Sequence, residues 1–331
     1  MSRRLRRAAA LAAGLVLMIG LAAGPAGADT WPTRPITILV AFNAGGSVDR
    51  MARGLAPYLS AELGKPVTVV NRPGAGGQAG TTWFLAQPDD GHTLMISPAT
   101  PYLATNILIT GAKYTLDDFA FVNAQWIDYA FLAVPKDRPY RSLKDLVDAI
   151  RANPGKVSTG VTFGSAGHVS TLVLLEALGL PHDAVRIVTF DGGGPLRTAL
   201  AGGHVDFSIQ QAEGADTIKD FVRPLAVLLD ERTPDWDAPP INEALAPYGV
   251  TVPIVSGSVR ALVAPAGFKA KHPQSFQKLV DAYRKVLQNQ EFQAWLRSNA
   301  IDGAWHGPER TTEIIRANFD VLRKYRHLLK D

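Results

Sequence analysis

The sequence of 331 residues contains no cysteine. It therefore forms no disulfide bond, offers no thiolate to a metal ion and has no cysteine nucleophile. Charged residues are few, at 19% of the chain, whereas apolar residues reach 47%. This composition is typical of a globular protein with a hydrophobic core and excludes disorder as the dominant state. At roughly 100–200 residues per domain, the length predicts two domains.

Signatures of catalysis are also missing. The sequence has no G-x-S-x-G, which excludes the nucleophile elbow of the α/β-hydrolases. Its seven histidines include no H-E-x-x-H and no close pair, so a zinc site has no support. We therefore predict a protein that is not an enzyme and that holds no metal and no cofactor.

The excess of positive charge lies at the N-terminus. The formal net charge is +4, and four arginines among residues 3–7 precede an apolar stretch over residues 8–23. A basic start, an apolar run and small residues at an A-x-A site are typical of a secretory signal peptide. A transmembrane anchor is the alternative, but the run is short for one and Pro25 closes it. We predict a signal peptide over residues 1–28, cleaved after Ala28.

Removal of this segment changes the charge of the protein. Residues 29–331 carry 30 basic and 30 acidic side chains, which gives a formal charge of zero. A neutral chain offers no basic patch for nucleic acid, so we predict no nucleic-acid partner. The signal peptide places the protein outside the cytoplasm, in a bacterial periplasm.

Apolar runs of strand length alternate with helical stretches along the mature chain. Such alternation predicts an α/β fold with a parallel sheet covered by helices. It occurs in two blocks, so we predict a lobe one of residues 29–129 plus 250–331 and a lobe two of residues 130–249. The predicted strands are residues 36–42, 67–70, 93–97, 131–134, 157–161, 185–189, 205–209, 225–229 and 260–264, and the main predicted helices are residues 47–63, 143–151 and 309–329.

Three loops share one design, because each follows a strand, is rich in glycine or serine, and opens a helix. They are residues 43–47, 164–167 and 191–194. Backbone N–H groups of such a loop, together with the partial positive charge of the helix N-terminus, bind a carboxylate or phosphate without a cationic side chain. Each loop alone could be a tight turn only. Three of them, at the carboxyl ends of strands in both lobes, favour a shared anion-binding cleft.

Several motifs in fixed order resemble the Bug family, the extracytoplasmic solute receptors of tripartite tricarboxylate transporters. The resemblance runs from about Trp31 to the C-terminus, nearly the whole mature chain. Residues 41–49 are similar to the family's PFxPGGxxD, residues 71–77 to NRPGAGG, residues 90–94 to DGYTL, residues 164–167 to GSAG and residues 262–267 to FAPAG.

The resemblance implies a type II periplasmic-binding-protein fold, in which two αβ lobes close by a hinge on a ligand in the cleft between them. It implies a receptor that captures a small carboxylate-containing organic acid for membrane permease subunits of the transporter. We expect a monomer. The predicted ligand-binding residues are Phe42, Asn43, Gly45, Gly46, Ser47, Asp49, Ser97, Thr100, Ser165, Ala166, Gly167, His168, Ser170 and Asp191.

One departure from the family concerns the ligand. Phe190 and Asp191 stand where the family has Tyr-Lys. An aspartate facing an anion would repel it, so a ligand with an amine, an amide or an aromatic body stays open. Two other functions also stay open: a receptor that signals to a membrane partner, and a secreted hydrolase that uses Ser47 or Ser165 with a histidine and Asp49.

Overall fold

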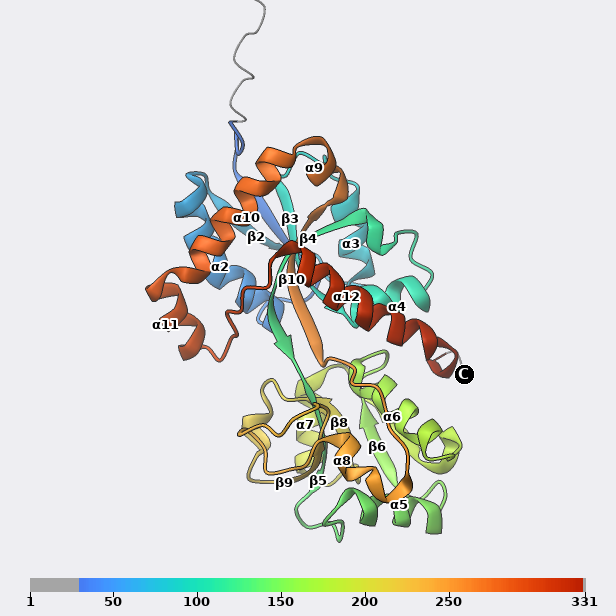
Figure 1. The fold of residues 1–331 in the computed structure, drawn as a ribbon. Helices are drawn as coiled ribbons and strands as arrows, with labels where there is room; N and C mark the ends of the chain where they lie inside the picture. The colour runs from blue at the N-terminus through green and yellow to red at the C-terminus, as the bar shows by residue number, and fades with distance from the viewer. Residues whose placement is uncertain (1–29, 330–331) are drawn as a thin grey trace, which may run out of the picture.

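The computed structural model describes residues 30–329, so the predicted signal peptide lies outside the described residues. Figure 1 shows two α/β lobes, one above the other, joined by strands that run from one into the other. The two-lobe architecture expected from the sequence is therefore present. Between residues 30 and 329, no helix is both long and apolar enough to cross a membrane.

Lobe one is built on a five-stranded sheet in the order β2-β1-β3-β10-β4. Strand β1 pairs parallel with β2 and β3, whereas β10 pairs antiparallel with β3 and β4. The prediction of a parallel sheet is confirmed for β2, β1 and β3 but is wrong for β10. This strand returns from lobe two and runs antiparallel to both of its neighbours. The bounds are β1 (Ile36–Val40), β2 (Val67–Asn71), β3 (Thr93–Thr100), β4 (Phe119–Asp128) and β10 (Ser258–Pro265).

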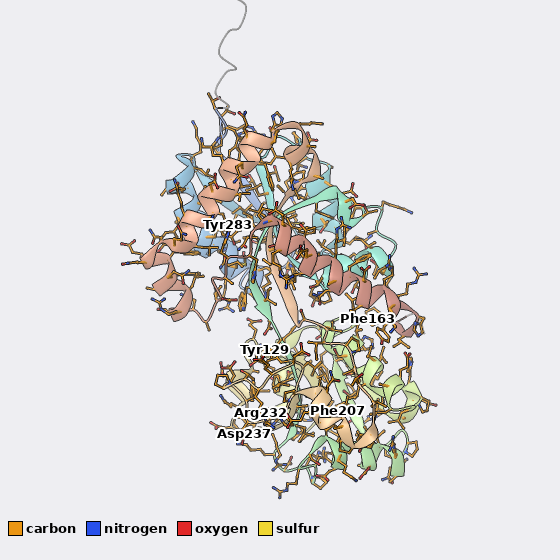
Figure 2. All side chains as sticks on the ribbon, viewed as in Figure 1. Tyr129, Phe163, Phe207, Arg232, Asp237 and Tyr283 are labelled. Carbon is orange, nitrogen blue, oxygen red and sulfur yellow. The ribbon has the colours of Figure 1, made fainter. Side chains whose placement is uncertain are left out.

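Helices cover both faces of this sheet, because alternate residues of its strands point to opposite sides. Ile38 belongs to the core under α2, α10 and α11, where Tyr283 is fully buried, and Leu39 belongs to the core under α3, α4 and α12 (Figures 1 and 2). The bounds are α2 (Ser47–Leu63), α3 (Gln78–Leu85), α4 (Tyr102–Leu108), α9 (Ala266–Lys271), α10 (Pro273–Gln288), α11 (Gln290–Ser298) and α12 (Gly307–Lys324).

Lobe two has a mixed sheet. Strand β5 lies between β8 and β9 and is antiparallel to both, and the parallel pair β6 and β7 joins β8 through a bridge between Thr159 and Phe207. Helices α5 and α6 pack on one face and α7 on the other. The bounds are β5 (Ala130–Pro135), α5 (Leu143–Ala152), β6 (Ser158–Val161), α6 (Ala166–Ala177), β7 (Arg186–Thr189), α7 (Gly193–Ala201), β8 (Ser208–Gln211), β9 (Val222–Val227) and α8 (Ile241–Ala244).

The two lobes are connected at two crossings that lie against each other. Tyr129 alone separates β4 from β5, and Figure 2 shows it where the lobes meet. The return crossing leads into β10, and its Gly257 donates its N–H to the Asp128 carbonyl at 2.9 Å. A Cβ on Gly257 would lie 2.8 Å from the Tyr129 backbone, so only glycine allows this approach. A third connection comes from the C-terminus, where Leu322 of α12 joins the core of lobe two.

Candidate functional site

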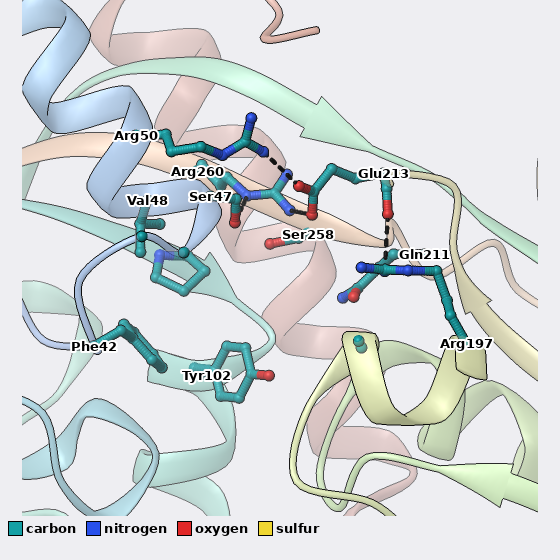
Figure 3. Close-up of a pocket in the computed structure, with 15 residues that line it drawn as sticks. Phe42, Ser47, Val48, Arg50, Tyr102, Arg197, Gln211, Glu213, Ser258 and Arg260 are labelled. Carbon is teal, nitrogen blue, oxygen red and sulfur yellow. Dashed lines mark hydrogen bonds and ion pairs between the residues drawn. The ribbon is translucent and has the colours of Figure 1, made fainter. Parts of the chain in front are cut away.

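A cavity of about 380 Å³ opens between the lobes, beside the two crossings (Figure 3). Both lobes contribute to it, which is the arrangement expected of a ligand cleft at a domain boundary. From lobe one it is lined by Phe42, Gly45, Gly46, Ser47, Val48, Arg50, Pro98, Tyr102, Ser258 and Arg260, and from lobe two by Gly193, Gly194, Arg197, Gln211 and Glu213.

The loop before α2 brings a helix N-terminus to this cavity. Gly46 occupies the N-cap, and no side chain caps the free N–H groups behind it. Asp49 lies buried beneath the loop and accepts hydrogen bonds from the Gly45 N–H at 2.8 Å and from Arg53 and Asn71 at 2.9 Å. Burial acts to raise the pKa of Asp49, but these hydrogen bonds outweigh it and hold the pKa below its usual value. Asp49 thus shapes the loop as a carboxylate and does not line the cavity.

Helix α7 brings a second N-terminus from lobe two. Its N-cap is Gly192, again without a side-chain cap, and Gly193 and Gly194 line the cavity. Helices α2 and α7 thus point uncapped N-termini at one cavity from opposite lobes. Their partial positive charges favour an anion there.

A buried arginine lies between these helix ends. The Arg260 side chain, on β10, is 3% exposed. Its Nε donates to the Ser47 Oγ at 3.0 Å and its Nη2 to the Glu213 Oε2 at 3.2 Å, while its guanidinium stacks 4.1 Å from the Trp126 ring centroid. The third nitrogen, Nη1, is buried and has no hydrogen-bond partner among the described residues. An orphaned donor on a buried cation costs free energy, which an anionic acceptor would recover.

Two further arginines line the same cavity. Arg50 of α2 donates to the Glu213 Oε1 at 2.9 Å, and Arg197 of α7 donates to the Glu213 carbonyl at 3.1 Å. The lining residues include three arginines and one carboxylate, which gives a formal charge of +2. The cavity is therefore suited to a negatively charged ligand.

Asp128 lies directly behind the arginines, at the end of β4. Its Oδ2 is 3.9 Å from the Arg260 Nη2 and accepts the Glu213 N–H at 3.3 Å. Burial, with a smaller contribution from the neighbouring Glu213, raises the pKa of Asp128 to about 6 against the opposing effect of Arg260. This carboxyl therefore changes its charge close to neutral pH.

The remaining wall of the cavity is apolar. Phe42 and Tyr102 meet edge to face with ring centroids 5.2 Å apart, and Val48 and Pro98 lie beside them. Burial raises the pKa of the Tyr102 hydroxyl, so this ring is neutral. The wall offers a surface for a hydrocarbon skeleton beside the cationic end.

The structure places the predicted residues of lobe one in two groups. Phe42, Gly45, Gly46 and Ser47 line the cavity, whereas Asn43 is exposed outside the lining. Ser97 and Thr100 are buried in β3 and, like Asp49, do not line the cavity. Pro98, which lies between them in the sequence, does line it.

In lobe two, Asp191 is exposed and outside the lining, so the repulsion expected of it does not arise in this cavity. The predicted loop at residues 164–167 makes a different contact: the Gly164 carbonyl accepts a hydrogen bond from the Thr105 Oγ1 of lobe one at 3.1 Å. The other predicted residues here, Ser165, Ala166, Gly167, His168 and Ser170, are buried around this loop and do not line the cavity.

His168 stabilises that loop in its neutral form. Its Nδ1 accepts the Gly164 N–H at 3.2 Å, and the Ser165 Oγ caps α6 by accepting the His168 N–H at 3.2 Å. Burial lowers the pKa of His168 to about 4, so the ring is uncharged at neutral pH. Within residues 30–329, no group of three or more side chains is placed to hold a metal ion.

Sequence reasoning missed the charged residues of the cavity, namely Arg50, Arg197, Glu213 and Arg260. One signal was present, because Arg260 begins an otherwise apolar predicted strand. A charged residue in such a position needs a buried partner.

Comparison with known proteins identifies the family. The profile of the "Tripartite tricarboxylate transporter family receptor" matches residues 51–330. A Cupriavidus necator protein described as "UPF0065 protein in gbd 5'region" is 32% identical over 295 residues, which is 87% of this chain and 85% of its own length. Protein BugT of Bordetella pertussis is 33% identical over 232 residues, which is 69% of this chain and 70% of its own length.

Solved structures agree with these sequence matches. MatC of Rhodopseudomonas palustris, with bound malate, has a TM-score of 0.69 and 25% identity, and covers 90% of this chain and 100% of its own. R. palustris Rpa4515, with adipate, has a TM-score of 0.70 and 27% identity, and covers 90% of this chain and 98% of its own. The predicted periplasmic-binding-protein fold is confirmed. The protein belongs to the tripartite tricarboxylate transporter family of receptors, as its resemblance to the Bug family predicted.

Proposed function

We propose that the protein is a periplasmic receptor that binds a small organic carboxylate in the interlobe cavity and delivers it to the permease of a tripartite tricarboxylate-type transporter. The observation that carries this proposal is Arg260, a buried cation with a free Nη1 that lines a cavity between two uncapped helix N-termini. A carboxylate provides the charge and the acceptor atoms that such a site lacks.

Four further observations support a carboxylate. The lining residues have a formal excess of positive charge, and Phe42 and Tyr102 provide an apolar wall for the carbon skeleton. Two relatives of known structure hold malate and adipate, both dicarboxylates. A cavity of about 380 Å³ suits a ligand of that size.

The remaining parts of the proposal follow from the N-terminus and the family. Residues 1–28 act as a cleaved export signal, and the mature protein works in the periplasm without catalysing a reaction. Residues 29–129 and 250–331 form one lobe and residues 130–249 the other. The closed, ligand-bound form is the one that the permease recognises.

The direct test is ligand screening with a blocked cavity. Gly194 lines the cavity, and a Cβ built there meets nothing within 4 Å, so Gly194→Trp fills the site without backbone strain. Lys156→Trp, at an exposed residue of lobe two that does not line the cavity, is the control. We expect malate or adipate to raise the melting temperature of the wild type and of Lys156→Trp, but not of Gly194→Trp.

Two results would contradict the proposal. One is that no small carboxylate binds the wild type at millimolar concentration in calorimetry. The other is that Gly194→Trp binds as tightly as the control.

A further inference from the structure

Glu213 connects the two lobes through its carboxylate. The residue follows β8 of lobe two, yet its Oε1 accepts from Arg50 at 2.9 Å and its Oε2 from Arg260 at 3.2 Å, and both arginines belong to lobe one. In Figure 3, dashed lines join this carboxylate to the guanidinium groups of Arg50 and Arg260. One oxygen on each arginine is an arrangement that the carboxylate of a ligand could also adopt.

The backbone of Glu213 has hydrogen-bond partners of its own, and its side chain is partly exposed. Its N–H donates to the Asp128 Oδ2 at 3.3 Å, and its carbonyl accepts from Arg197 at 3.1 Å. The side chain itself is 21% exposed, and the side chain of its partner Arg50 is 40% exposed. Rotation of the Glu213 side chain therefore returns its carboxylate to water without moving the main chain.

The energetic balance of this contact favours exchange. The pair with Arg50 is partly exposed, so it contributes little stability. The Arg260 side chain is only 3% exposed, so Glu213 can leave it at low cost only when another anion takes its place. Arg260, which is almost fully buried, keeps a cost as long as its Nη1 has no acceptor. A ligand carboxylate that takes the place of Glu213 preserves the neutralisation of both arginines and adds the contacts of its own skeleton.

We propose, building on the function proposed above, that Glu213 is an internal competitor for the ligand. In the ligand-free protein its carboxylate holds Arg50 and Arg260 and keeps the lobes close together; the carboxylate of the ligand replaces it. Glu213 thereby determines specificity, because a neutral analogue cannot replace it at the two arginines.

The experiment compares Glu213→Gln with Glu243→Gln. Glu243 pairs with Arg232 on the surface of lobe two, so its variant makes the same chemical change outside the cavity. Because the chain has no cysteine, Lys156→Cys in lobe two and Ala270→Cys in lobe one, both exposed, accept spin labels at these two positions only. Pulsed electron resonance then reports the interlobe distance, and calorimetry reports the affinity for adipate and for its neutral diamide.

In Glu213→Gln without ligand, we expect a longer and broader interlobe distance and about tenfold tighter adipate binding, which corresponds to ~1.4 kcal/mol. The affinity for the diamide should stay unchanged, and Glu243→Gln should match the wild type in all three measurements. Circular dichroism and the melting temperature confirm that each variant is folded.

Either of two results overturns the proposal. An unchanged interlobe distance in Glu213→Gln shows that the residue does not hold the lobes. Weaker adipate binding shows that Glu213 positions the arginines for the ligand and does not compete with it. If the wild type binds no carboxylate, the proposed function fails, while the distance measurement still decides whether Glu213 connects the lobes.

Discussion

Replacement of Arg260 by glutamine removes the buried cation on which the binding proposal depends. Glutamine keeps a polar group on β10 but loses the positive charge and the forked donors. The Ser47 Oγ loses its 3.0 Å partner, and the Glu213 Oε2 loses its 3.2 Å partner. The side chain that replaces Arg260 is also too short to stack on Trp126 as the guanidinium does.

The loss in ligand affinity can be derived from these contacts. A hydrogen bond to a charged group contributes about 1.5–3 kcal/mol. Truncation of one partner of a buried charged pair costs about 2–5 kcal/mol, part of which is the carboxylate left unpaired. We therefore expect Arg260→Gln to weaken carboxylate binding by about 3 kcal/mol, or roughly a hundredfold. The pKa of Asp128 should rise further above about 6, because the nearby cation that lowers it is gone.

Isothermal calorimetry with adipate is the assay, with circular dichroism as the check on folding. Arg260→Lys is the companion variant, since lysine keeps the charge but has no forked donor for Ser47 and Glu213 together. It should lie between the wild type and Arg260→Gln. Wild-type affinity in Arg260→Gln would refute the reasoning, because the anion site would then not depend on the buried cation.

Three further predictions follow from the remaining parts of the chain. Gly167→Ala places a Cβ 2.0 Å from the Ile209 carbonyl oxygen, so we expect urea unfolding to show a free energy of unfolding lower by about 1–3 kcal/mol. The control Gly194→Ala, whose Cβ meets nothing within 4 Å, should unfold like the wild type. Equal urea midpoints for the wild type and both variants would contradict this prediction. A bound anion raises the pKa of Asp128 above about 6, so ligand binding takes up a proton and the affinity should rise as the pH falls from 8 to 5. Calorimetry in buffers of different ionisation enthalpy measures this proton uptake. An affinity that does not change with pH would exclude the coupling. N-terminal sequencing of exported protein should begin at residue 29, directly after Ala28, and an intact Met1 would favour an anchor instead.

Local patterns predicted much of lobe one. The helix predicted at residues 47–63 matches α2 at both ends, because its apolar spacing is regular and Gly64 ends it in the left-handed conformation. The strand Phe119–Asp128 was missed. Strand direction was wrong for β10, because the apolar pattern of a strand is the same whichever way it runs.

In lobe two, predicted strands were displaced along the chain. The strand expected at residues 205–209 begins at Ser208, because Asp206 uses its carboxylate to accept hydrogen bonds from the Ser158 N–H and hydroxyl. The strand expected at residues 225–229 is Val222–Val227. Specific side-chain contacts of this kind are invisible to a hydrophobic pattern.

The cavity, too, could be predicted only in part. Two of the three predicted loops meet at it, because both follow strand ends that face the gap between the lobes. The ion pairs were not predictable, since Glu213 lies 163 residues from Arg50 and 47 from Arg260. Only the fold brings these three side chains together.

The position of β10 has a consequence for the order in which the chain folds. This strand lies between β3 and β4 in the sheet of lobe one, although about 130 residues separate β4 from it along the chain. Until it arrives, β4 has no neighbour in that sheet and β3 exposes an open edge. Every strand of lobe two, by contrast, lies between Ala130 and Val227. During synthesis from the N-terminus, lobe two can therefore complete its sheet first, and lobe one must wait for β10.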